Sequence, residues 1–252
     1  MKNIAVVVLA AGKGKRMKSD LPKVLHPILG RPLIEYLLDT LLDIEIGRIA
    51  VVIGYQADLV KKSLATYQGK IEFVLQEEQL GTGHAVMMAE PTLKDFDGDI
   101  LVLAGDVPFL SRETIVNLVE THRKEKAAAT VLSSKPPDPA GYGRIIRRGL
   151  TNLVEKIVEH KDATDDEKTV GEINTGTFCF QAGPLFEALK KIKNDNSQKE
   201  YYLTDVMEIL RREGRKAAVY LTDDSDEGLG VNSVEQLADL EQRFVSRQAG
   251  KS

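Results

Sequence analysis

The feature that most constrains the fold is an alternation of apolar, strand-like runs with amphipathic, helix-like segments. Residues 4–9 form a continuous apolar run rich in valine, which is typical of a strand buried on both faces of a parallel sheet. The same pattern predicts strands at residues 49–53, 71–75 and 100–103, and helices beginning at Pro32 and at residues 58–65, 83–89 and 112–124. Short connections between such elements predict an α/β, Rossmann-like, mostly parallel open sheet with helices on both faces.

The pattern changes near residue 136. Three strand-like runs follow without intervening helices, at residues 143–147, 153–159 and 173–181, and they predict a small antiparallel insertion beside the main sheet. Helices at residues 185–191 and 203–213, a strand at residues 217–221 and a last helix opened by Ser233 complete the chain. We therefore expect a single domain over residues 1–252, with a first half at residues 1–135, a second half at residues 136–232 and a C-terminal helix and tail at residues 233–252.

Composition limits the partners of the chain. With 34 Lys and Arg against 38 Asp and Glu, the net charge is −4, so no broad basic face for a nucleic-acid backbone is expected. The apolar run near the N-terminus is too short to span a bilayer, and we expect a cytoplasmic protein without a membrane partner. Cys179 is the only cysteine in the sequence and is expected to be a buried core thiol.

A glycine-rich, basic loop follows the first strand. Gly12 and Gly14 would let the backbone approach a phosphate chain, while Arg16 and Lys23 would add fixed positive charge. The alternative is a tight turn with solvated cations. The loop is neither a P-loop nor a dinucleotide fingerprint, because Met17 stands where the latter needs a third glycine.

Two further segments follow strands at the edge where open α/β sheets bind ligands. The first, residues 76–85, contains two carboxamides and a Gly-Thr-Gly turn, which suit recognition of a base that both donates and accepts hydrogen bonds. A polar loop capping a helix is the alternative, and His84 is expected at the helix start rather than as a base or a metal ligand. The second places Asp106 directly after an apolar run, where its carboxylate suits Mg²⁺ unless it serves only in a turn.

Together with residues 141–145, 158–163, 172–176, 200–205 and 230–233, these segments resemble the sugar-nucleotide pyrophosphorylases. Within that family they are most similar to the uridylyltransferase domain of the bacterial N-acetylglucosamine-1-phosphate uridylyltransferases. The similarity covers nearly the whole chain in the expected order, which makes it specific. It implies a Mg²⁺-dependent transfer of a uridylyl group from UTP to a sugar 1-phosphate, in the supply of cell-wall precursors.

The resemblance also assigns roles to residues. The first half, residues 1–135, would bind the nucleotide through Leu9, Ala10, Ala11, Gly12, Gly14, Lys23, Gln76, Gln79, Gly81 and Thr82. The second half, residues 136–232, would bind the sugar through Gly143, Glu159, Asn174, Thr204 and Asn232. Asp106 and Asn232 would hold Mg²⁺, and Arg16, Lys23 and Asp106 would be catalytic.

The sequence departs from the family in three respects. Lys15 replaces a usual Thr or Ser, and Ala104 stands where close relatives often carry Tyr. The bifunctional relatives continue into a β-helix of hexapeptide repeats that performs acetyl transfer and forms trimers. This sequence lacks such repeats, so we expect no acetyl transfer and a monomer or small homo-oligomer.

Three other functions stay open on the sequence alone. A sister transferase would use glucose 1-phosphate or dTTP. A regulatory protein would bind a UDP-sugar without turnover, although binding alone does not need Arg16, Lys23, Asp106 and Asn232 together. A purely structural protein would leave the ordered motifs unexplained.

Overall fold

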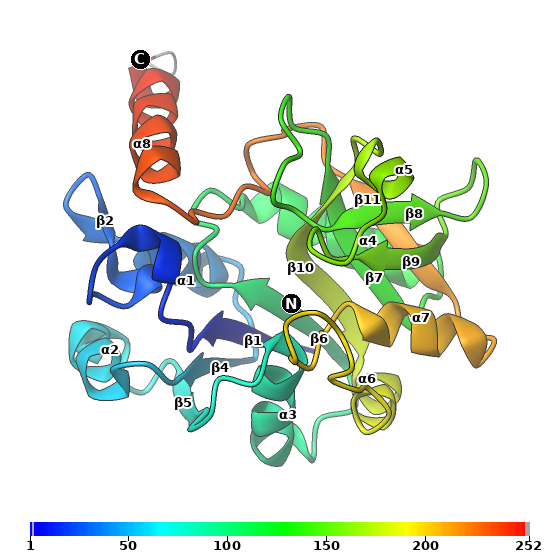
Figure 1. Ribbon diagram of the computed structural model, residues 1–252. Coiled ribbons are helices and arrows are strands. Elements are labelled where there is room, and N and C mark those ends of the chain that lie inside the picture. Colours follow the sequence, from blue (N-terminus) through cyan, green and yellow to red (C-terminus); the bar gives the residue numbers. More distant parts are fainter. Residues whose placement is uncertain (2, 250–252) are drawn as a thin grey trace.

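The computed structural model describes residues 1 and 3–249. Its main sheet has the strand order β11-β7-β10-β6-β1-β4-β5 (Figure 1). These strands are β1 (Ile4–Ala10), β4 (Arg48–Ile53), β5 (Glu72–Leu75), β6 (Asp99–Ala104), β7 (Ala129–Ser134), β10 (Ile173–Gln181) and β11 (Ala217–Leu221). All neighbours are parallel except for β10, which runs antiparallel to both β6 and β7. The predicted α/β class with a mostly parallel sheet is confirmed.

Helices cover both faces of the sheet because its strands alternate their side chains between two apolar cores. In β1, Val6 and Val8 face one core, to which α1 (Leu33–Asp43), α2 (Ala57–Ser63) and α4 (Arg112–Lys124) contribute. Ala5 and Val7 face the other, to which α3 (Thr82–Leu93), α6 (Ala182–Leu189) and α7 (Asp205–Arg212) contribute (Figure 1). Within the described part of the chain, none of the helices combines the length and apolar character needed to cross a bilayer.

Two assignments made from the sequence were wrong or incomplete. Only β8 (Arg144–Arg147) and β9 (Val154–Val158) form the antiparallel insertion, whereas β10 lies inside the main sheet, between β6 and β7. The sequence pattern did not assign β7, the fully buried partner that makes this placement possible. The short helix α5 (Asp165–Lys168) separates the insertion from β10.

Helix α3 is longer than expected and continues through Pro91. Ala89 and Leu93 on its last turns are buried in the core, so packing outweighs the one backbone hydrogen bond that proline removes. Helix α4 begins as predicted, because Ser111 Oγ accepts a hydrogen bond from the backbone N–H of Thr114 at 3.1 Å.

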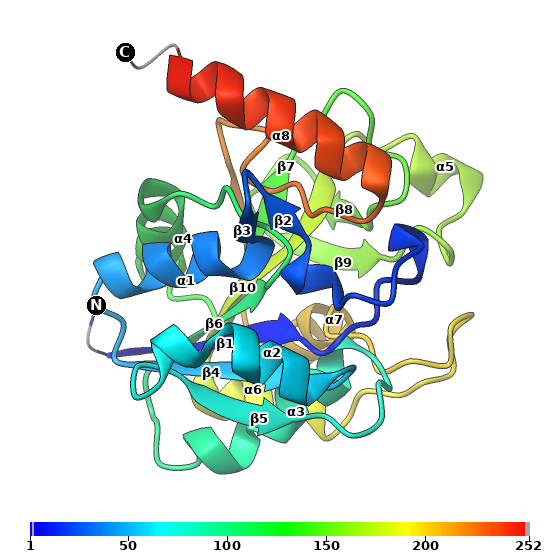
Figure 2. The same ribbon diagram turned by 90° about the vertical axis from the view of Figure 1, so that its left-hand side faces the viewer.

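The last helix, α8 (Val234–Ala249), lies across the hairpin of β2 (Pro27–Ile28) and β3 (Arg31–Pro32) (Figure 2). Leu240 of α8 packs with Ile28, Met17 and Val231 in a third apolar cluster. The Leu29 N–H also donates to Glu241 Oε1 at 2.8 Å. These contacts hold α8 against the loop that follows β1, although the two are distant in sequence.

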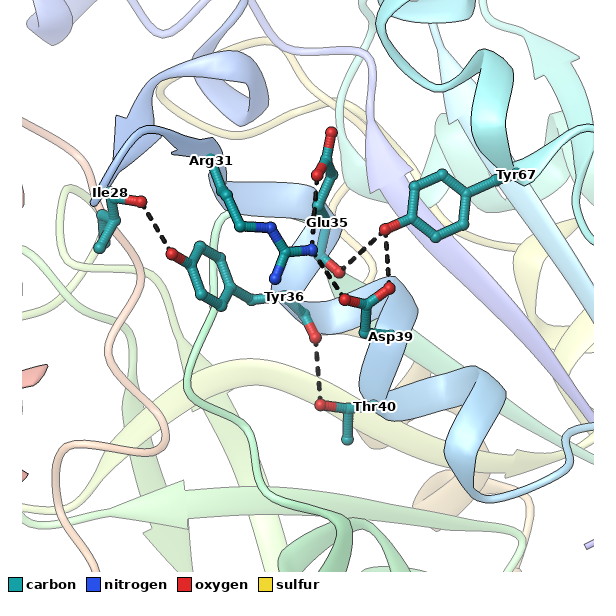
Figure 3. A network of polar contacts seen from close by, with 7 residues as sticks. All are labelled: Ile28, Arg31, Glu35, Tyr36, Asp39, Thr40 and Tyr67. Carbon is teal, nitrogen blue, oxygen red and sulfur yellow. Dashed lines mark hydrogen bonds and ion pairs between the residues drawn. The ribbon is translucent and has the colours of Figure 1, made fainter. Parts of the chain in front are cut away.

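A polar network ties α1 to its neighbours (Figure 3). Arg31 Nη2 lies 2.7 Å from Asp39 Oδ2, and the Tyr67 hydroxyl donates to Asp39 Oδ1 at 2.8 Å. Burial, reinforced by the bond to Asp39, raises the pKa of the Tyr67 hydroxyl. The β2–β3 hairpin and the segment after α2 are thereby fixed to the same helix.

Candidate active site

The predicted site residues gather at one edge of the sheet because of strand direction. β1, β5 and β6 are parallel, directly or through β4, so the residues after them, Gly12, Gln76 and Asp106, lie at their shared carboxyl edge. Since β10 runs the opposite way, its beginning reaches that same edge and brings Asn174 there. The antiparallel strand therefore joins the second half of the chain to the site.

A cavity of about 440 Å³ opens at this edge. Most of the predicted site residues line it: Leu9, Ala10, Ala11, Gly12, Lys23, Gln76, Gln79, Gly81, Thr82, Asp106, Gly143, Glu159, Asn174 and Asn232. The volume suits a small molecule held by a few polar groups.

Three predicted residues do not line the cavity, and each lies next to one that does. Gly14 has φ 70°, and a Cβ there would lie 2.8 Å from Lys23 Cβ, so this glycine supports the stem of the lysine. Arg16 is exposed, and a Cβ placed on Gly141 at the cavity wall would lie 4.0 Å from its Nη1. Thr204 is buried and donates its hydroxyl to Glu159 Oε1 at 3.1 Å.

The side chain of Lys23 contacts both of the residues that were expected to hold the metal, Asp106 and Asn232. The Lys23 ammonium donates to Asn232 Oδ1 at 2.7 Å and forms a salt bridge with Asp106 Oδ2. Gly230 allows the carboxylate this position, because a Cβ on it would lie 3.2 Å from Asp106 Oδ2. The start of α8 fixes Asn232, whose N–H donates to Gln236 Oε1 at 2.8 Å.

The oxygen atoms of Asp106 and Asn232 fit a hard divalent cation, since both already contact one ammonium group. Among the described residues, no group of three or more His, Cys, Asp and Glu side chains could hold a metal ion. A cation here would therefore complete its coordination with ligand oxygens or water.

The side of the cavity built from the second half of the chain offers a carboxylate and an amide. Burial raises the pKa of the Glu159 carboxyl; the Thr204 hydrogen bond opposes this effect and nearby Asp205 adds to it. The Gly176 N–H donates to Asn174 Oδ1 at 2.9 Å, so the amide nitrogen of Asn174 is the end left for a ligand. Asn174 itself is placed by its N–H, which donates to the Gly143 carbonyl at 2.9 Å.

The side built from the first half of the chain depends on a close backbone crossing. The Gly83 N–H donates to the Tyr201 carbonyl at 2.8 Å, and the Tyr201 N–H donates to the Leu80 carbonyl at 2.8 Å. Thr82 Oγ1 accepts from the Leu203 N–H at 3.1 Å. The turn between β5 and α3 is therefore held by the segment before α7.

Sequence reasoning did not select several cavity-lining residues as site residues. They are Val24, Ala85, Ala104, Val107, Gly141, Tyr142, Thr175, Gly176, Glu200 and Gly230. Most of them stand inside the motif segments or directly after a strand, and this position is the signal that could have identified them. Of the two side-chain departures, Ala104 lines the cavity near Gly176, and the Lys15 side chain lies outside the described part of the structure.

Comparison with known proteins gives similarities in family, sequence and fold. Residues 6–171 match the family model of the MobA-like NTP transferase domain. The chain is 51% identical over 241 residues to the "Bifunctional protein GlmU" of Shouchella clausii, covering 96% of this chain and 52% of that protein. Its identity to the protein of the same name from Lactobacillus delbrueckii is 52%, covering 93% of this chain and 50% of that protein. The chain thus spans about half the length of the curated relatives it matches.

Two solved structures share the fold. A UDP-glucose pyrophosphorylase complexed with UDP-glucose superposes with a TM-score of 0.76 at 18% identity, over 96% of this chain and 98% of that one. HddC from Yersinia pseudotuberculosis complexed with GMP-PN gives a TM-score of 0.69 at 22% identity, over 95% of this chain and 99% of that one. At these identities the similarity establishes the fold alone.

Proposed function

The chain belongs to the MobA-like NTP transferase family, and from that premise we propose that it transfers a uridylyl group from UTP to N-acetyl-α-D-glucosamine 1-phosphate. The products would be UDP-N-acetylglucosamine and pyrophosphate, and Mg²⁺ would be required. The ordered motifs that resemble the uridylyltransferases support this choice of substrates.

One observation carries the proposal: segments from both halves of the chain line one cavity around a shared cation position. Lys23 and Asp106 come from the first half and Asn232 from the second, and the Lys23 ammonium contacts both of the other side chains. A site for joining two phosphorylated molecules needs positive charge between binding surfaces for each. This arrangement supports transfer better than binding of one ligand alone.

In the proposed reaction, a phosphate oxygen of the sugar phosphate attacks the α-phosphorus of UTP in line. The new O–P bond forms as the bond between the α-phosphorus and the bridging oxygen to the β-phosphate breaks, and pyrophosphate leaves with that electron pair. The attacking phosphate is already ionised at neutral pH, so no general base is needed. Lys23 and Arg16 would neutralise charge on the reacting and departing phosphates.

Asp106 and Asn232 would hold the metal ion. When bound, Mg²⁺ would supply positive charge that reduces the repulsion between the two anionic substrates. Lys23 would then be free to leave Asp106 and contact phosphate. Glu159 and Asn174 would bind sugar hydroxyl and N-acetyl groups through their remaining acceptor and donor atoms.

The direct test measures pyrophosphate release by the purified chain with UTP, N-acetylglucosamine 1-phosphate and Mg²⁺, with and without chelator. Parallel reactions with glucose 1-phosphate and with dTTP identify a sister transferase. Binding of UDP-N-acetylglucosamine without turnover in any of these reactions would instead indicate a regulatory protein and contradict the proposal.

Asp106→Asn tests the site itself. We expect turnover to fall on the order of 100-fold, the scale of losing one strong electrostatic group, and Mn²⁺ binding measured by electron paramagnetic resonance to weaken. Asp43→Asn, at an exposed position at the end of α1, is the matched control and should change neither quantity. Near-normal turnover and Mn²⁺ binding in Asp106→Asn would refute the metal role.

A further inference from the structure

Gln76 is a buried carboxamide whose nitrogen contacts two groups at the start of α3. Its side chain is part of the cavity wall, and the residue is only 2% exposed. Gln76 Nε2 lies 3.2 Å from the Gly81 carbonyl oxygen and 3.0 Å from His84 Nδ1. His84 does not line the cavity, but it contacts Gln76, which does.

These contacts determine which way the carboxamide faces. A carbonyl oxygen can only accept, so the group facing Gly81 must be the NH₂ of Gln76, which has two hydrogens to donate. One hydrogen goes to the Gly81 carbonyl and the other to His84. His84 Nδ1 is therefore the acceptor of this hydrogen bond.

The carboxamide oxygen is left for the ligand. Both N–H donors of Gln76 are used, and its side-chain hydrogen bonds to described residues involve Nε2 and not Oε1. The nearby carboxamide of Gln79 is committed elsewhere, because its Nε2 donates to the backbone carbonyls of Gln76 and Glu77 at 3.0 and 3.1 Å. At this point the cavity therefore presents an acceptor, and a ligand must bring an N–H or O–H donor.

From this geometry we infer that His84 determines base specificity: by accepting from Gln76 it keeps Oε1 toward the cavity and selects a base with an imide N–H. The inference rests on the proposed nucleotide transfer and deepens it. Uracil and thymine carry a donor at N3, whereas cytosine has an acceptor at the same position. Cytosine would place its lone pair against Gln76 Oε1 and be rejected.

Removing the acceptor at position 84 tests the inference. In His84→Phe a C–H replaces Nδ1, and the carboxamide is then oriented by the Gly81 carbonyl alone. In His84→Asn the Oδ1 atom occupies about the place of Nδ1 and still accepts, which makes it the matched control. If the phenylalanine variant does not fold, as judged by thermal melting, His84→Leu removes the acceptor in the same way.

The measurements are dissociation constants of UTP and CTP by calorimetric titration, together with KM and kcat. We expect the preference of the wild type for UTP over CTP to fall about tenfold in His84→Phe, the effect of one neutral hydrogen bond, and to survive in His84→Asn. The KM for UTP should rise, while kcat at saturating UTP and the KM for the sugar phosphate stay within about twofold. An unchanged UTP-to-CTP ratio in both Phe and Leu variants overturns the inference.

The wild-type measurements separate this inference from the proposed function. If the wild type prefers dTTP to UTP, the choice of UTP as substrate is overturned. The role of His84 is retained in that case if the wild type also prefers dTTP to dCTP and His84→Phe loses this second preference. A wild type that prefers CTP would overturn the role of His84, whether or not the chain transfers nucleotides. If the wild type turns over UTP and the variants keep its base preference, the proposed function is supported and the role of His84 is overturned.

Discussion

Replacing Gly81 by alanine should destabilise the whole protein, because Gly81 combines an unusual backbone conformation with a close approach of two chain segments. Its φ is 113°, in a region that residues other than glycine rarely adopt. A Cβ there would lie 2.6 Å from the Tyr201 carbonyl oxygen and 2.8 Å from the Tyr201 nitrogen. Both Tyr201 groups make backbone hydrogen bonds to the turn that contains Gly81.

The magnitude follows from two contributions. Holding a non-glycine residue in this conformation costs about 1–3 kcal/mol. Relieving the overlap means moving the Tyr201 backbone, which weakens its two hydrogen bonds to Leu80 and Gly83 at about 1 kcal/mol each. We expect Gly81→Ala to lower the free energy of unfolding by about 3–5 kcal/mol, or the melting temperature by roughly 6–20 °C for a chain of this size.

Gly12→Ala is the matched control, because a Cβ on Gly12 would meet no atom within 4 Å and its φ is not positive. It should leave the free energy of unfolding within about 1 kcal/mol of the wild type. Because Gly12 lines the cavity, its added methyl group should weaken UTP binding. Urea denaturation and calorimetric titration measure the two effects. Equal stability of Gly81→Ala and Gly12→Ala would refute the argument.

Three further predictions concern charge and capping. Burial, followed by nearby Glu208, Asp195 and Asp162, raises the pKa of the Asp205 carboxyl to about 6. As the pH rises, the unfolded chain therefore loses this proton before the folded one, so stability falls between about pH 4 and 6. In urea titrations, Asp205→Asn should raise the free energy of unfolding by about 1–2 kcal/mol at pH 7, after allowance for solvent screening, and should not change it below about pH 4. An equal effect at both pH values would show that the raised pKa of Asp205 is not the cause. Arg16→Ala should lower kcat on the order of 100-fold in the pyrophosphate assay with little change in melting temperature, whereas an unchanged kcat would remove Arg16 from the mechanism. Ser111→Ala should cost about 1 kcal/mol in urea denaturation, since it removes the cap of α4, and an unaltered transition would mean that water replaces the cap.

The arrangement of the site also explains why distant segments of the chain must be intact for it to form. Asn232 is held by Gln236 of α8, and α8 packs on the β2–β3 hairpin that follows Lys23. The turn that holds Gly81 is fixed by Tyr201, which lies just before α7. Contacts remote from the cavity therefore set the distances within it.

Much of the fold could be read from local patterns. Periods of apolar residues identified most strands and helices, and Ser111 marked the start of α4 correctly. Gly12, Gln76 and Asp106 each follow a strand that was predicted to be parallel, and this was enough to predict that they meet at one edge of the sheet. In the structure all three line the cavity. These successes depend only on neighbouring residues and on the shared direction of parallel strands.

Pairing between distant strands could not be read in this way. Nothing in residues 173–181 distinguishes an insertion strand from a central one, and β7 was not recognised, so the position of β10 was assigned wrongly. That pairing is what brings Asn174 to the site. The contact of Lys23 with both Asp106 and Asn232, and the orientation of Gln76 by His84, likewise appear only in three dimensions.

The sequence by itself determined the α/β class, the edge of the sheet that carries the cavity and most of the residues that line it. Only the tertiary structure decided which strand runs antiparallel to its neighbours, which amide atoms of Asn174 and Gln76 form hydrogen bonds within the protein, and that Lys23 contacts both Asp106 and Asn232. The physical reason is sequence distance. Hydrophobic periodicity is visible within a few consecutive residues, whereas hydrogen-bond partners such as Lys23 and Asn232 are far apart in sequence and come together only on folding.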